Sequence, residues 1–136
     1  MNNSRQHMKK WREGLIKKGL CASCGKVPVQ DFKTCLICRL ASNVRTTARD
    51  RRYRKIVLAH YGGYCTCCGE TEEAFLDLAH VNDDGQQHRK IAGKGNGFCR
   101  WLVLNNFPTE FEIEIQCSNC NQGKRRNGGV CPHKKK

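Results

Sequence analysis

The hydrophobic residues of the chain follow a helical spacing in its first half. Between residues 4 and 18 the apolar side chains fall near one stripe, and Gly19 is placed to end the segment, so this stretch is predicted to be a helix. Residues 39–60 have a similar spacing and predict a second helix, which ends at Gly62-Gly63.

In the second half the apolar segments are shorter. Residues 75–79 form a run that is long enough for a strand but not for a helix, and residues 111–115 alternate between apolar and acidic side chains, which predicts a second strand. Residues 99–104 are predicted to form a short helix, and a final helical segment is expected after Cys120. Residues 82–96 are polar and contain several glycines, so they are predicted to be mostly loop.

The composition predicts a thin core that needs additional stabilisation. The chain has 136 residues, of which 38% are hydrophobic and 27% are charged, and it contains 11 cysteines. Small domains of this kind are commonly held by metals or disulfides. The first residues contain no apolar signal segment, and no apolar run approaches the roughly 18 residues of a membrane span. We therefore expect a reducing compartment, no membrane association, and zinc rather than disulfides.

The cysteine spacing predicts two zinc sites. Two Cys-x-x-Cys pairs lie close together in residues 21–38, and two further pairs flank the apolar run at 75–79. Four thiolates in this arrangement suit tetrahedral zinc, with bonds of about 2.3 Å. The predicted ligands are Cys21, Cys24, Cys35 and Cys38 for the first zinc ion, and Cys65, Cys68, Cys117 and Cys120 for the second. Small zinc ribbons serve as structural clamps as often as they read DNA, so the first motif leaves both roles open.

The charge is concentrated in the first half of the chain. Residues 1–60 contain 15 Lys and Arg against 3 Asp and Glu, a net charge of +12, whereas residues 61–136 contain 10 against 9, a net charge of +1. This asymmetry predicts an arm that binds nucleic acid, joined to a separate site. Arg45, Arg49 and Arg52 follow one another at helical spacing and are candidate phosphate contacts. A helix face that is simply solvated is the alternative.

One histidine stands out between the second set of cysteines. His80 follows the predicted strand at 75–79 and is followed by a polar segment that contains Gly85. A zinc site beside such a histidine is a means of holding a reactive imidazole on a small scaffold. The alternative is a polar residue that caps a loop beside the zinc.

Residues 61–133 resemble the HNH endonucleases, specifically the small phage-like type with a four-cysteine zinc site. The resemblance rests on an ordered set of motifs at residues 61–70, 79–85, 88–89, 100–102, 105–108, 117–121 and 128–133. It implies a ββα-metal fold, similar to a treble clef, that is held by zinc, binds one divalent ion and hydrolyses phosphodiester bonds. The fold class expected for the whole chain is therefore small, zinc-stabilised α+β.

The same resemblance implies roles for several residues. His80 would be the general base that deprotonates the attacking water. Asn121 would bind a catalytic Mg²⁺ or Mn²⁺ ion. The asparagine that steadies the loop around the base in this family has two candidates, Asn105 and Asn106. His88 would contact the phosphate or a metal, or orient the loop.

One departure from the family concerns the divalent ion. The residue before the catalytic histidine is usually an aspartate ligand, and here it is Ala79. Because Mg²⁺ is usually held by carboxylates, its binding would need another acidic residue. The candidates are Asp77, Asp83 and Asp84. If none of them reaches the ion, the protein is a weak nuclease, a nuclease that uses a different metal, or a binding protein on an HNH scaffold.

The sequence-based division of the chain has three parts. Residues 1–60 form a basic region with a zinc ribbon at 21–38 and a helical arm, residues 61–133 form the nuclease-like domain, and residues 134–136 form a disordered basic tail. The expected partner is double-stranded DNA, with Arg89, Arg100 and Lys124 as further contacts, and the protein is a monomer or a homodimer. The resemblance points to a phage or mobile element and to the cytoplasm or nucleoid of a bacterial cell. Cys131 and His133 would cap the domain or join a metal site, with Cys67 as a candidate partner.

Overall fold

The computed structural model describes residues 3–93 and 95–134, which divide into two compact units. The first unit extends to Ala48 and the second begins at Arg49. The boundary lies inside the long helix α2 (Leu36–His60) rather than at Gly62-Gly63, because the end of this helix belongs to the core of the second unit.

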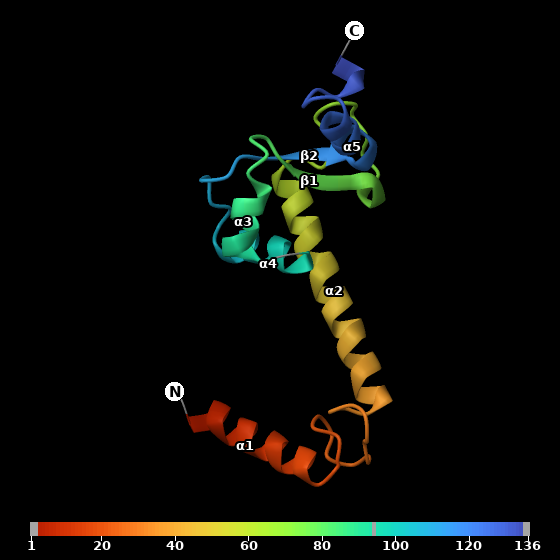
Figure 1. The fold of residues 1–136 in the computed structure, drawn as a ribbon, viewed down its shortest axis with the longest axis vertical. Helices are drawn as coiled ribbons and strands as arrows, with labels where there is room; N and C mark the ends of the chain where they lie inside the picture. The colour runs from red at the N-terminus through yellow and green to blue at the C-terminus, as the bar shows by residue number, and fades with distance from the viewer. Residues whose placement is uncertain (1–2, 94, 135–136) are drawn as a thin grey trace. The chain divides into compact units, whose positions relative to one another are not determined.

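The first unit contains α1 (Asn3–Lys17), a cysteine-bearing loop and the first part of α2 (Figure 1). Gly19 has a positive φ of 65° and turns the chain directly after α1, as its position in the sequence predicts. A single β-bridge between Leu20 and Pro28 closes the loop that follows. The core of the first unit is small: Cys21 and Ala22 are buried, whereas Trp11 of α1 remains 42% exposed. A core of this size cannot by itself offset the entropy of ordering the unit.

The second unit is built around a two-stranded antiparallel sheet. Strand β1 (Leu76–His80) pairs with β2 (Ile113–Cys117) in a register that sets Leu78 opposite Ile115 and His80 opposite Ile113. Helix α5 (Ser118–Arg126) follows β2 directly and packs against both strands (Figure 1). Both predicted strands are therefore confirmed within one or two residues. The chain is a small α+β protein with five α-helices in its described part.

Two apolar clusters hold the second unit together. One gathers Leu58, Leu76 and Ile115 with buried cysteines, and the other gathers residues around Val57 and Leu102. The guanidinium of Arg54 donates hydrogen bonds to the backbone carbonyls of Glu73, at 3.1 Å, and Leu76, which attaches the end of α2 to the start of β1. A short 3-10 helix, η1 (Glu73–Phe75), precedes the strand.

The expectation of a mostly irregular segment at residues 82–96 is wrong. Helix α3 (Gly85–Ala92) occupies most of it, and α4 (Asn96–Leu104) begins earlier than the helix expected at 99–104. The buried residues of α3 are Gly85, His88 and Ala92, which lie on one helical face. None of these three is a strong hydrophobic signal, which is why the helical pattern escapes a search for apolar periodicity.

The chain ends in a second 3-10 helix, η2 (Pro132–Lys134), which packs on α5. The expectation of a disordered tail at residues 134–136 is wrong for Lys134, which lies in η2, and residues 135 and 136 lie outside the described residues. Across the described ranges, no helix combines the length and the apolar character that crossing a membrane requires.

Candidate functional site

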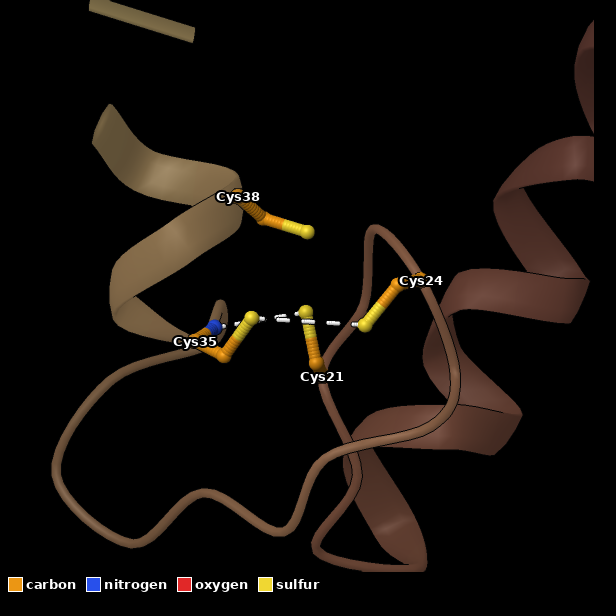
Figure 2. Close-up of side chains that lie close together, drawn as sticks. All are labelled: Cys21, Cys24, Cys35 and Cys38. Atoms are coloured by element: carbon orange, nitrogen blue, oxygen red, sulfur yellow. Dashed lines mark hydrogen bonds between the residues drawn. The ribbon is translucent and has the colours of Figure 1, made fainter. Parts of the chain in front are cut away.

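The first group of cysteines converges in the first unit. Cys21 and Cys24 come from the loop after α1, Cys35 directly precedes α2, and Cys38 lies in the first turn of α2 (Figure 2). Their four sulfurs lie within 4.8 Å of one another, and Cys24 Sγ is 4.0 Å from Cys35 Sγ. In a tetrahedral site with metal–sulfur bonds of about 2.3 Å, neighbouring sulfurs lie about 3.8 Å apart. The geometry therefore suits zinc.

The second group of cysteines lies in the second unit and draws its members from three neighbouring segments. Cys65 and Cys68 come from a turn before β1, Cys117 ends β2, and Cys120 lies in the first turn of α5. Cys68 Sγ is 3.6 Å from Cys117 Sγ, again close to the edge of a zinc–thiolate tetrahedron. This group can hold zinc and would then join the turn, the sheet and α5.

Backbone amides favour the thiolate form of one cysteine in each group. Hydrogen bonds from the backbone of Cys24 and Cys35 lower the pKa of Cys21 to about 6. Burial opposes ionisation of Cys65, but the backbone amides led by that of Cys117 lower its pKa to about 6 as well. Because the thiolate is the form that binds metal, each group has one ligand that is ionised at neutral pH.

A third group combines Cys67, Cys120, Cys131 and His133, whose ligand atoms also lie within 4.8 Å of one another. A link between Cys67 and the Cys131–His133 segment was one of two alternatives that the sequence left open. The presence of Cys120 in this group was not expected, because its Cys-x-x-Cys pair assigns it to the second group.

A polar pocket of about 510 Å³ lies in the second unit. His80 at the end of β1, Asp83 in the following turn and Asn121 in α5 all line it. The remaining lining residues are Leu78, Ala79, Gly85, Gln86, Arg89, Lys124, Arg125 and Gly129. The pocket thus combines a histidine, a carboxylate, two amides and three basic side chains.

His80 is held by the fully buried His88. His80 Nε2 lies 2.9 Å from His88 Nδ1, and the His88 ring stacks on Phe111 with ring centroids 4.0 Å apart. Phe98 and Trp101 contact the same ring edge to face. Because His88 is enclosed by aromatic rings, it cannot reach a phosphate in solvent. Of the roles that the sequence left open for it, orientation of the His80 loop agrees with this geometry.

The hydrogen bond to His88 leaves Nδ1 as the nitrogen of His80 that is available to a substrate. Within the described part of the chain, Nδ1 carries no hydrogen bond. A β-carbon at Gly85 would fall 2.8 Å from Nδ1, so only glycine leaves room beside this atom. For Nδ1 to accept a proton, Nε2 must carry one and donate it to His88 Nδ1. This tautomer is the one that a general base acting through Nδ1 requires.

The electrostatic surroundings keep both histidines neutral. Burial lowers the pKa of His80 below its ordinary value of 6.5, although Asp84 partly opposes the shift. Burial and the neighbouring His80 lower the pKa of His88 as well. At neutral pH the imidazole of His80 is therefore an unprotonated base.

This shift has a consequence for the pH dependence of any reaction in which His80 is the base. Because a lowered pKa keeps the imidazole neutral to lower pH, we expect the acidic limb of the kcat/KM profile to have its midpoint below 6.5. Rates of DNA cleavage measured between pH 5 and 9 would check this. A midpoint above 6.5 would contradict the buried, neutral imidazole.

The other residues expected at the site are distributed differently. Asp77 accepts a 2.7 Å hydrogen bond from Ser118 Oγ and is not among the residues that line the pocket. Asp84 precedes α3, and its Oδ1 is buried without a hydrogen-bond partner among the described residues. Asp83 is the carboxylate that lines the pocket, and the sequence pattern alone gives no way to choose it over Asp84.

Asn105 and Asn106 lie at the end of α4, away from the pocket lining. The Asn105 side chain donates a 2.8 Å hydrogen bond to the carbonyl of Trp101, and Asn106 is exposed with a positive φ of 54°. Their expected role beside His80 stays a prediction. The contact that steadies His80 in this structure comes from His88.

The basic residues expected to contact DNA are exposed or partly exposed. Arg89 and Lys124 line the pocket, and Lys124 Nζ also donates to the carbonyl of Val81 at 3.4 Å. Arg49 forms an ion pair of 3.0 Å with Asp50, an exposed contact of little energetic weight. Arg45, Arg52 and Arg100 are exposed.

Comparison of the chain with protein-family models, with curated proteins and with solved structures finds no match.

Proposed function

We propose that this protein is a metal-dependent DNA endonuclease or nickase of the HNH type, with His80 as the general base. The observation that carries the proposal is the pocket in which His80, Asp83 and Asn121 meet three basic side chains. A neutral imidazole beside hard oxygen ligands and cations matches the needs of phosphodiester hydrolysis. The order β1, β2, α5 and the adjacent cysteine group agree with the ββα-metal arrangement that the sequence resembles.

The reaction needs a water molecule whose proton passes to His80 Nδ1 as its oxygen bonds to phosphorus. The bond from phosphorus to the leaving oxygen then breaks. Arg89, Lys124 and Arg125 line the same pocket and would bind the non-bridging phosphate oxygens through charge-assisted hydrogen bonds. His88 would hold the His80 ring during the proton transfer.

A divalent cation would find two oxygen ligands in this pocket. Asp83 supplies a carboxylate and Asn121 an amide oxygen, which are ligand types that Mg²⁺ and Mn²⁺ accept. Such an ion would neutralise charge on the phosphate and on the leaving oxygen. Ala79 lines the pocket but offers no ligand, so the ion would rely on Asp83 for a negative charge.

The proposal is tested by incubating supercoiled plasmid with the full chain and Mg²⁺, Mn²⁺ or Ni²⁺ and following nicked and linear products. Metal-dependent nicking supports the enzyme. A protein that binds DNA tightly and in a salt-sensitive manner, but cuts with none of these ions, would instead be a binding protein. The specific observation that favours this second function is Ala79, because the expected carboxylate is missing there.

Substitution of Ala79 by Asp should strengthen divalent-ion binding. The new carboxylate would enter the pocket beside Asp83, and at limiting Mg²⁺ we expect the nicking rate to rise about tenfold, equivalent to about 1.4 kcal/mol of binding. The Mg²⁺ concentration at half-maximal rate would measure the effect. Ala79→Asn is the matched control, because it has a similar size without the charge. Equal rates for the two variants would show that a carboxylate here does not contribute to metal binding.

A further inference from the structure

The second and third groups of cysteine and histidine share one residue. Each group contains four ligand atoms that lie within 4.8 Å of one another, and Cys120 is a member of both. Cys120 Sγ also lies 3.2 Å from His133 Nδ1. Since each group is compact, and since Cys120 lies in both, the two sets form one continuous cluster around a single sulfur.

The number of ligands fits two metal ions. Two tetrahedral ions require eight ligand positions, and the two groups of four contain seven different residues because Cys120 is counted twice. Seven residues supply eight positions when one thiolate bridges two ions. We propose that this cluster binds two zinc ions, one in each group, with Cys120 as the bridging ligand. The ligands of the second ion are Cys67, Cys120, Cys131 and His133.

The fold brings these ligands together from three separate segments. Cys67 lies between Cys65 and Cys68 in the turn before β1, and Cys120 lies in the first turn of α5. Cys131 directly precedes η2, and His133 lies within it. A β-carbon at Gly123 would fall 3.0 Å from Pro132 Cδ, so a glycine at this position of α5 allows η2 to approach. Neither Gly123 nor Pro132 is a proposed ligand, so their close contact is a separate observation. It agrees with a metal site between α5 and η2.

The charge balance also permits a second ion. One zinc ion with four thiolates has a net charge of −2. The second ion brings two positive charges, and Cys67 and Cys131 add two negative charges as thiolates while His133 stays neutral. The complete cluster therefore also has a net charge of −2, so the second ion adds no net charge to a largely buried region.

A second ion would attach the C-terminal segment to α5. Cys120 is directly followed by Asn121, which lines the His80 pocket, so the bridging residue fixes the start of the helix that carries this side chain. The proposed metal site is independent of the nuclease proposal, because a structural cluster of this kind would be present whether or not the pocket is catalytic.

The test is the zinc content of the full chain, purified under reducing conditions and measured by native mass spectrometry and elemental analysis. We expect three zinc ions per chain, one in the first unit and two in the shared cluster. Cys67→Ser, Cys131→Ser and His133→Asn should each lower the content to two. Cys99→Ser and His7→Asn are matched controls, because neither residue belongs to a cysteine or histidine group, and both should retain three.

Thiol counting in the native, zinc-loaded protein gives a second measurement that does not depend on a variant folding. With the bridged cluster, ten of the 11 cysteines are ligands and only Cys99 is left outside them. Two zinc ions per chain, with Cys67 and Cys131 alkylated as readily as unligated thiols, would overturn the proposal. In the cadmium-113 form, NMR coupling between two cadmium ions would support the shared sulfur, whereas three uncoupled signals would overturn Cys120 as the bridge.

Discussion

Replacing His80 by Ala should reduce plasmid nicking by a factor of about 10² to 10⁴, the range that a positioned general base contributes. Nε2 of the native ring lies 2.9 Å from His88 Nδ1, and its own Nδ1 carries no hydrogen bond within the described residues. The alanine variant keeps the pocket and its basic residues but lacks the imidazole that accepts the proton of water. The measurement is the initial rate of nicking at saturating Mg²⁺ or Mn²⁺, at pH 7 to 8.

His7→Ala is a suitable control, because His7 is exposed on α1 and belongs to the other unit. It should nick at the native rate. DNA affinity and far-ultraviolet circular dichroism should be unchanged in His80→Ala, because His80 is only partly buried at the end of its strand. An unchanged nicking rate in His80→Ala would mean that another group, or a contaminating nuclease, removes the proton.

The sequence predicts the strands well and the helix α3 poorly, and the two outcomes have the same physical origin. In β2 the buried Ile113 and Ile115 flank the partly exposed Glu114, so this part of the strand shows its period of two in hydrophobicity alone. The buried face of α3 is made by Gly85, His88 and Ala92. A glycine and a histidine enter this face because of His80, one to leave space beside it and the other to bind it. Such reasons depend on three-dimensional contacts and leave no hydrophobic pattern.

The residues of the candidate site could also be predicted only in part from the sequence. His80, Asn121, Arg89 and Lys124 could be selected from the sequence, and the structure brings them to one pocket. The choice among three nearby aspartates could not be made, because a shift of one residue in a tight turn redirects a side chain. Asp83 has a positive φ of 55°, a conformation that the sequence does not specify for a residue other than glycine.

The cysteines show what spacing can and cannot indicate. Cys-x-x-Cys pairs predict two of the three groups because neighbouring ligands in a turn have a fixed separation in sequence. The third group draws its ligands from segments whose separation depends on the whole fold. It also reuses Cys120, whereas spacing arguments assign each residue to one ion.

Removing zinc should unfold both units. The apolar clusters are small, and buried cysteines make up a large part of the cluster around Leu58, Leu76 and Ile115. Closed zinc–thiolate sites contribute apparent binding free energies of about 10–16 kcal/mol, which is comparable to or larger than the total stability of about 5–15 kcal/mol of a typical domain. We therefore expect EDTA to abolish the cooperative thermal transition and most of the helical circular dichroism, and zinc added under reducing conditions to restore both.

One control distinguishes the effect of the zinc ions from that of the proposed catalytic ion. A second control distinguishes the zinc site of the first unit from that of the second. Dialysis into Mg²⁺-free buffer without a chelator should stop nicking but leave the thermal transition unchanged, because the pocket of His80 is separate from the cysteine groups. Cys24→Ser should destabilise the first unit alone and Cys68→Ser the second, since each removes one ligand from a different group. Full helicity and an unchanged melting temperature in protein shown by elemental analysis to be zinc-free would mean that the apolar clusters alone hold the fold.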